Sequence, residues 1–217
     1  MFEQDKMVIH PLWPTNVYAM KTEDLNLLPV IQEERLKEVG RMRSNIGGYQ
    51  SHTEMEDKPA FKPLLDQITK FFRTIRQMKQ YETIQDIQVS QMWFNINGRS
   101  HYNEMHCHGN LYQFSGTYYV KCPKNSGRIC FRDPRPGAFN NEFHFRYSQQ
   151  DYGTNYYGTF KFPVEDNLLV IFPSFLEHYV EASQSDEERV TISFDVTVRT
   201  SDGYKGFLTK NDFFSKV

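Results

Sequence analysis

The segment "HCHGNLYQFSGTYYV", from His106 to Val120, places two histidines one residue apart, directly before a strand-like run. Side chains at positions i and i+2 of a strand point to the same face, so His106 and His108 are expected to converge while Cys107 points away. Imidazole is the commonest metal-binding side chain, and this spacing suits two ligands of one ion. The alternative is a pair of hydrated histidines near a loop, because an isolated His-x-His is a weak signal.

The chain on both sides of this segment reads as a series of short strands. From residue 86 to residue 200, about eight runs rich in β-branched and aromatic residues are separated by turn signals. They are "DIQVSQMWFNI", "FSGTYYVKC", "GRICFR", "EFHFRY", "YYGTFKF", "NLLVIFP", "HYVEA" and "RVTISFDVTV". Such a series predicts a mainly β fold, a jelly roll or a barrel, with helices packed outside.

The first third of the chain has helical spacing. Apolar residues lie among charged ones at Leu28, Ile31, Val39 and Met42, and from Phe61 to Met78 they recur at three- and four-residue intervals. The stretch 45–59 between them is expected to be a loop because of its Gly, Ser, Asp and Pro content. We predict a single domain over 1–217, in which 1–85 packs on the barrel as a strand and helices. Residues 86–200 would then form the jelly-roll core and 201–217 a tail.

Composition excludes several classes of protein. The 25 Lys and Arg oppose 27 Asp and Glu, and this near-neutral balance argues against nucleic acid as a partner. No apolar run reaches the length of a membrane span, and the first residues lack the apolar core of a signal peptide. The three cysteines indicate a reducing compartment, so a cytoplasmic location in a bacterial cell or a phage-infected host is expected. The aromatic tail is able to dock on the body or on a second subunit, as in a homodimer.

Two later polar residues draw attention because of their neighbours. His178 follows the apolar run "NLLVIFP", and polar residues at the rim of a buried strand are costly without a partner or task. Arg189 opens an alternating strand and shares one face with Thr191 and Ser193. If that face points into the barrel, the buried guanidinium needs an anion there. If it faces solvent, Arg189 pairs with an acid such as Glu187 instead.

These features together resemble the Fe(II)- and 2-oxoglutarate-dependent oxygenases. The spacing of His-x-His, His178 and Arg189 on short strands matches that superfamily, and more narrowly a bacterial and phage group distantly related to prolyl hydroxylases. The matching pieces cover most of the chain in order. They are "LWPTNVY", "NIGGYQS", "MWFNING", "HCHGNLYQFSGTYYV", "SGRICFRDPR", "LLVIFPSFLEHYV" and "ERVTISFDV".

The resemblance implies a double-stranded β-helix that holds iron and 2-oxoglutarate and uses O2 to hydroxylate a C–H bond. The substrate would be a small molecule or a peptide, such as an amino acid or a prolyl residue. The residues that the resemblance assigns to the site fall in two groups. Iron would be bound by His106, His108 and His178, and 2-oxoglutarate by Arg189, Tyr119, Thr191 and Asn95.

One position departs from the superfamily pattern. The usual triad has two histidines and one carboxylate, and His108 stands where the carboxylate is expected. Glu104, two residues before His106, is the alternative carboxylate ligand. A cupin is another interpretation, although Phe175 stands where a cupin motif has Gly. A non-catalytic jelly roll that serves as a binding or structural module is the third.

Overall fold

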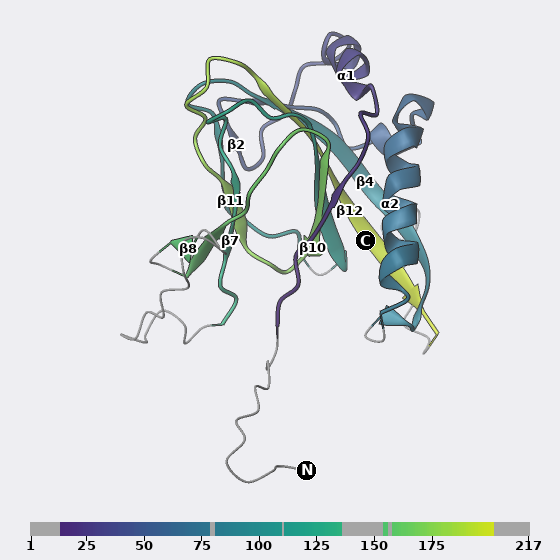
Figure 1. The fold of residues 1–217 in the computed structure, drawn as a ribbon. Coiled ribbons are helices and arrows are strands. Elements are labelled where there is room, and N and C mark those ends of the chain that lie inside the picture. Colours follow the sequence, from purple (N-terminus) through teal and green to yellow (C-terminus); the bar gives the residue numbers. More distant parts are fainter. Residues whose placement is uncertain (1–13, 79–80, 110, 136–153, 156–157, 202–217) are drawn as a thin grey trace, which may run out of the picture.

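Two six-stranded antiparallel sheets form the body of the protein in this computed structural model, which describes residues 14–78, 81–109, 111–135, 154–155 and 158–201 (Figure 1). The first sheet has the order β1 (Tyr18–Lys21), β10 (Leu168–Pro173), β6 (Phe114–Lys121), β12 (Arg189–Thr200), β4 (Ile84–Asn97), β3 (Tyr49–Gln50). The second has the order β2 (Asn45–Ile46), β5 (Tyr102–His106), β11 (His178–Val180), β7 (Ile129–Arg132), β9 (Thr159–Lys161), β8 (Thr154–Asn155). The predicted double-stranded β-helix is confirmed. The strand predicted in "EFHFRY" and the tail from residue 202 lie outside the described residues.

Helix α2 (Lys62–Ile75) packs on the outside of the first sheet, beside β4 and β12 (Figure 1). Its apolar stripe is buried, at Leu64, Ile68, Phe71, Phe72 and Ile75. The ring of Phe72 meets that of Phe114 in β6 edge to face, with centroids 5.2 Å apart. The residues whose three-and-four spacing predicted this helix therefore form the face that covers the sheet. The turns η1 (Met55–Asp57) and η2 (Pro59–Phe61) lead into it.

Helix α1 (Leu27–Arg35) is shorter than its sequence pattern predicts. Only Leu27 and Ile31 of this helix are buried, whereas Val39 and Met42 are 90% and 76% exposed. The predicted extension to Met42 is wrong because the chain leaves the helix for the sheet. The backbone N–H of Arg41 donates to the carbonyl of Gln50 in β3, at 2.8 Å.

Strand β12 lies between β4 and β6 in register, and this pairing arranges polar residues in rows. Thr191 stands opposite Asn95 on one side and Tyr119 on the other. Farther along, Asp195 stands opposite Gln91 and Ser115. Residues that are far apart in sequence thus face the interior side by side.

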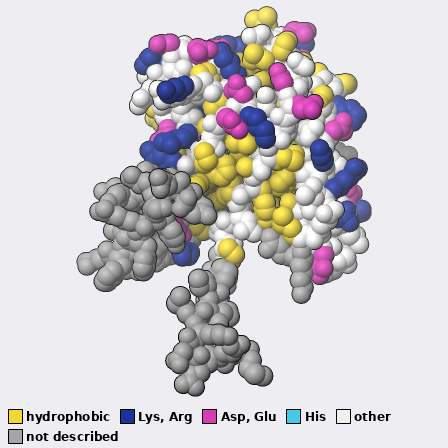
Figure 2. Space-filling view, viewed as in Figure 1, with side chains coloured by type: hydrophobic (Ala, Val, Ile, Leu, Met, Phe, Trp, Pro, Cys, Tyr) yellow, Lys and Arg dark blue, Asp and Glu magenta, His cyan; other side chains and the backbone are white. Residues whose placement is uncertain are grey.

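The outer surface carries intermixed charges. Figure 2 shows Lys and Arg side chains scattered among Asp and Glu around a central apolar area, with no histidine visible on this face. Among the described residues, no helix is long and apolar enough to span a membrane.

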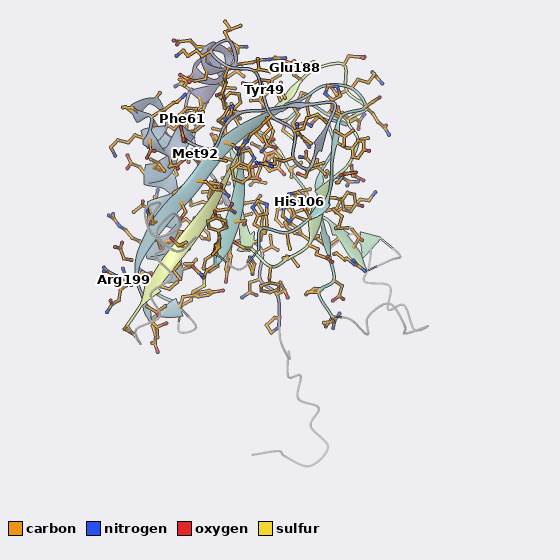
Figure 3. The ribbon with its side chains drawn as sticks, turned by 180° about the vertical axis from the view of Figure 1, so that it is seen from behind. Tyr49, Phe61, Met92, His106, Glu188 and Arg199 are labelled. Atoms are coloured by element: carbon orange, nitrogen blue, oxygen red, sulfur yellow. The ribbon has the colours of Figure 1, made fainter. Side chains whose placement is uncertain are left out.

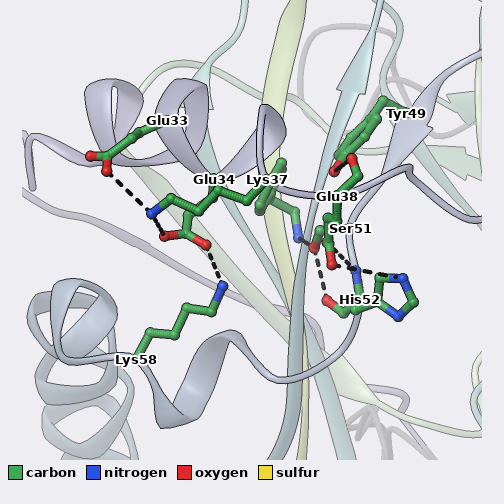
Figure 4. Close-up of polar contacts among 9 residues, drawn as sticks. Glu33, Glu34, Lys37, Glu38, Tyr49, Ser51, His52 and Lys58 are labelled. Atoms are coloured by element: carbon green, nitrogen blue, oxygen red, sulfur yellow. Dashed lines mark hydrogen bonds and ion pairs between the residues drawn. The ribbon is translucent and has the colours of Figure 1, made fainter.

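An ion-pair cluster fixes the end of α1 to the segment before α2 (Figure 4). The carboxylate of Glu34 accepts a hydrogen bond from Lys37 at 2.8 Å and also pairs with Lys58. Only 13% of the Glu34 side chain is exposed. The hydrogen bonds from Lys37 and then Lys58 lower the pKa of Glu34 below its usual 4.5, against the effect of burial.

We predict that Glu34→Gln lowers the free energy of unfolding at pH 7 by about 1 kcal/mol. Because the folded-state pKa of Glu34 is lowered, this contribution is present above pH 4.5 and is lost as the pH falls through the folded pKa. Urea unfolding at pH 7, 4 and 3 measures the difference. The control is Glu33→Gln, since Glu33 also pairs with Lys37 but is 74% exposed. Equal effects of the two variants at pH 7 would contradict the prediction.

Candidate active site

A cavity with a volume of about 740 Å³ lies between the two sheets. Strands β4, β6 and β12 contribute one wall, and β5, β7 and β11 contribute the other. Figure 3 labels Phe61 and Met92 on the side of the first sheet that the helices cover, and His106 across the barrel at the second sheet. The volume is in the range of ligand pockets.

Three histidines meet in this cavity. His106 and His178 stand opposite each other where β5 pairs with β11, and their ring centroids are 4.4 Å apart. His108 lies just beyond the end of β5, where its backbone N–H donates to the carbonyl of Ser174 at 3.0 Å. One nitrogen from each of the three rings lies within 4.8 Å of the others, an arrangement that could hold a metal ion.

The other ring nitrogen of each histidine is already engaged. The Nδ1 atoms of His106 and His178 donate to the backbone carbonyls of Glu104 and Leu176, at 2.7 and 2.9 Å. The Nδ1 atom of His108 donates to Oδ1 of Asp195 at 2.7 Å. A proton on every Nδ1 leaves a lone pair on every Nε2 that can bind a metal, which is the usual way that ligating histidines are oriented. The Nε2 of His106 has one long contact, with the Ser44 hydroxyl at 3.4 Å.

The surroundings of His106 and His178 favour the neutral imidazole. Burial lowers the pKa of His178 well below its usual 6.5, and the charges of His106 and His108 lower it further. Burial likewise lowers the pKa of His106. Metal ions bind the deprotonated nitrogen, so the lowered pKa values of these two histidines favour metal binding at neutral pH.

The inner wall of the cavity holds the four residues that the resemblance assigned to 2-oxoglutarate. Arg189, Tyr119, Thr191 and Asn95 are all buried and all line the cavity. The alternative in which Arg189 faces solvent is therefore wrong. Burial raises the pKa of the Tyr119 hydroxyl, which keeps it a hydrogen-bond donor. The Oδ1 atom of Asn95 is buried and has no hydrogen-bond partner in the described structure.

Arg189 is only partly satisfied within the protein. Its Nη1 donates to the carbonyl of Gly127 at 3.0 Å, while its Nε is buried without a partner in the described structure. Gly127 has a φ of +87°, and a Cβ there would stand 2.2 Å from the carbonyl oxygen of Glu181. A glycine is therefore required where this loop approaches Arg189. A buried guanidinium with free donors is expected to bind an anion from outside the protein.

Two expectations near the histidines turn out differently. The side chain of Glu104 is exposed and is not part of the histidine cluster, so the structure does not bring this alternative ligand to the site. Cys107 was expected to point away from the site, yet it borders the cavity. The reason is that β5 ends at His106, so the alternation of a strand does not continue through Cys107.

Asp195 is the site residue that the sequence analysis missed. Its carboxylate is fully buried and accepts hydrogen bonds from His108, from Ser115 at 2.5 Å and from Gln91 at 2.5 Å. The signal was present in the sequence, because Asp195 continues the inward alternation of Arg189, Thr191 and Ser193 on β12. A buried carboxylate bound to a ligating imidazole fixes the ring and makes its other nitrogen a stronger ligand.

The comparisons with known proteins agree with this geometry. Residues 91–195 match the family described as "Putative 2OG-Fe(II) oxygenase". This region of the chain is therefore similar to the 2OG-Fe(II) oxygenases. It contains His106, His108 and His178 together with all four residues of the inner wall. A comparison with curated proteins found no match.

Solved structures of 2OG-Fe(II) oxygenases share the fold. A prolyl-4-hydroxylase from Pseudomonas putida aligns with a TM-score of 0.58 and 12% identity, over 86% of this chain and 93% of that one. The carbocyclase SnoK from nogalamycin biosynthesis aligns with a TM-score of 0.59 and 12% identity, over 94% and 87%. A 2OG-Fe(II) oxygenase family oxidoreductase from Burkholderia pseudomallei gives 0.56 and 11%, over 83% and 84%. At these identities the likeness establishes the fold.

We predict that Asp195→Asn weakens metal binding by roughly 10- to 100-fold, because the neutral amide removes the charge behind His108. Competition of the apo-protein with a chelating dye for Co(II) measures the affinity, and a thermal melt confirms folding. The matched control is Asp186→Asn, which makes the same chemical change at a residue 86% exposed and paired with Arg99. Equal Co(II) affinities in the two variants would contradict the role of Asp195.

Proposed function

We propose that this protein is an Fe(II)- and 2-oxoglutarate-dependent dioxygenase that hydroxylates a C–H bond of a small-molecule or peptide substrate. His106, His108 and His178 would be the iron ligands. Arg189, Tyr119, Thr191 and Asn95 would hold 2-oxoglutarate. The match of residues 91–195 to the 2OG-Fe(II) oxygenase family supports the choice of metal and co-substrate.

The proposal rests on one observation, which is that the same cavity contains a cluster of three histidines and a buried guanidinium group. Three histidines bring potential ligand nitrogens together there, and the buried Arg189 has a donor without an acceptor in the described structure. The distal carboxylate of 2-oxoglutarate would accept hydrogen bonds from Arg189, and its geometry suits the planar guanidinium. The other end of 2-oxoglutarate would be left to chelate a metal on the histidines. The donor set therefore fits both groups.

The residues of the chain bind and orient in this proposal. Arg189 would hold the distal carboxylate. The hydroxyl groups of Thr191 on β12 and of Tyr119, which stands opposite it on β6, would be further donors. Trp93, whose ring stacks on His108 with centroids 5.7 Å apart, would shield one side of the metal site from water. Bound Fe(II) and 2-oxoglutarate would supply the O2-dependent chemistry, which no side chain of this cavity provides by itself.

The experiment that tests the proposal is anaerobic titration of the Fe(II)-loaded protein with 2-oxoglutarate, followed by visible absorption. A weak charge-transfer band that requires both components is expected. Arg189→Gln should raise the 2-oxoglutarate concentration for half-saturation at least about tenfold, since it removes a charge-assisted pair. His178→Ala should abolish the band.

The matched control for Arg189→Gln is Arg199→Gln. Arg199 lies on the same strand, is half exposed and pairs with Asp86, so its loss should leave the titration unchanged. A wild-type protein that binds Fe(II) but forms no band with 2-oxoglutarate would contradict the proposal. It would favour a metal-binding cupin or a non-catalytic module.

A further inference from the structure

Two arginines border the cavity near the histidines and are not among the residues proposed to hold the metal or 2-oxoglutarate. Arg41 and Arg43 lie in the segment between α1 and β2, and both line the cavity. This segment runs beside β5, because the carbonyl of Ser44 accepts the backbone N–H of Glu104 at 2.8 Å. The Ser44 hydroxyl lies 3.4 Å from Nε2 of His106. The two guanidinium groups are thus carried to the same opening as the proposed metal site.

Neither guanidinium group has a partner of opposite charge among the described residues. The Nε atom of Arg41 is buried and has no hydrogen-bond partner there. Burial lowers the pKa of Arg41, and the charge of Arg43 lowers it further, with Glu38 and Glu54 opposing. Arg128, by contrast, is paired with the carboxylate of Glu181. Arg41 is partly buried and Arg43 is exposed, and two neighbouring like charges without an ion-pair partner repel each other.

The backbone holds these arginines in place despite that cost. The N–H of Arg41 donates to Gln50 in β3 at 2.8 Å, and the N–H of Arg43 donates to the side chain of Asn45 at 2.7 Å. The Asn45 amide in turn donates to the Arg41 carbonyl at 3.2 Å. A rigid segment that presents unpaired charge to a cavity is preorganised for a ligand of the opposite charge.

The net charge of the residues that line the cavity indicates the charge of a second ligand. In a count of net charge, the two negative charges of 2-oxoglutarate would equal the two positive charges of Fe(II). The single charges of Arg189 and Asp195, which do not pair with each other, would also cancel. Arg41 and Arg43 then remain as an excess of positive charge among the residues that line the cavity. The volume of about 740 Å³ also leaves room for a second molecule beside a five-carbon diacid.

We propose that Arg41 and Arg43 bind an anionic group of the substrate, a carboxylate or a phosphate, and hold its target C–H bond at the metal. This inference rests on the proposed function, of which it specifies the substrate class. The substrate would be an acidic molecule, such as an amino acid, an acidic peptide or a phosphorylated metabolite. The planar guanidinium is suited to bind either anion through two parallel hydrogen bonds.

Nuclear relaxation by bound Co(II) tests this inference without knowledge of the substrate. The protein is loaded with Co(II) and saturated with 2-oxoglutarate, and inorganic phosphate is added. Phosphorus relaxation is measured against a Zn(II)-loaded reference. A parallel titration with acetate, read on its methyl protons, distinguishes carboxylate from phosphate. The variants are Arg41→Gln and Arg43→Gln, with Arg73→Gln on the exposed side of α2 as the charge-matched control.

We expect enhanced relaxation of one or both anions in the wild type and in Arg73→Gln. Binding in Arg41→Gln and Arg43→Gln should be weaker by at least about tenfold. Equal relaxation in all three variants, or none above the Zn(II) reference in the wild type, would overturn the inference. The Co(II) absorption spectrum and its change on addition of 2-oxoglutarate report on folding and on the proposed function separately. If the Co(II) spectrum is normal and only the anion effect is missing, the proposed function stands and this inference alone fails.

Discussion

Strand β12 carries a guanidinium group and a carboxylate into the interior, and the burial of these two charges is the constraint on which the site depends. Arg189 and Asp195 are 2% and 0% exposed. Asp195 is satisfied within the chain by His108, Ser115 and Gln91. Arg189 is not, since it keeps a buried Nε without a partner in the described structure. The charge of Asp195 is therefore satisfied within the protein, whereas that of Arg189 is left for a ligand.

The pairing of Asp195 with His108 also bears on the departure from two histidines and a carboxylate. A neutral imidazole leaves a divalent ion with one more positive charge than an aspartate ligand would. Asp195 restores that negative charge one hydrogen bond away, at 2.7 Å from the ring. In this account the carboxylate of the usual triad is replaced by an imidazole with a carboxylate behind it. The metal would then be held by three neutral nitrogens that are each oriented by an oxygen acceptor.

Local pattern was sufficient for some of these features and insufficient for others. The spacing of Phe61 to Met78 predicted α2, and the alternation after Arg189 predicted which side chains share a face. The end of α1 could not be predicted, because the hydrogen bond between Arg41 and Gln50 that redirects the chain belongs to the sheet. The partner of His108 is 87 residues away in sequence and depends on how β12 registers against its neighbours. The sequence alone could not indicate a role for Arg41 and Arg43, because that role depends on the cavity that they border.

The central claim is that three histidine nitrogens, and no carboxylate, bind the metal. A crystal structure of the protein grown without oxygen with Fe(II) and 2-oxoglutarate, with the iron located by anomalous scattering, tests it directly. The account predicts iron on the Nε2 atoms of His106, His108 and His178, with the distal carboxylate of 2-oxoglutarate on Arg189. Asp195 should remain on Nδ1 of His108. Iron bound to the carboxylate of Glu104 or Asp195, or 2-oxoglutarate away from Arg189, would contradict it.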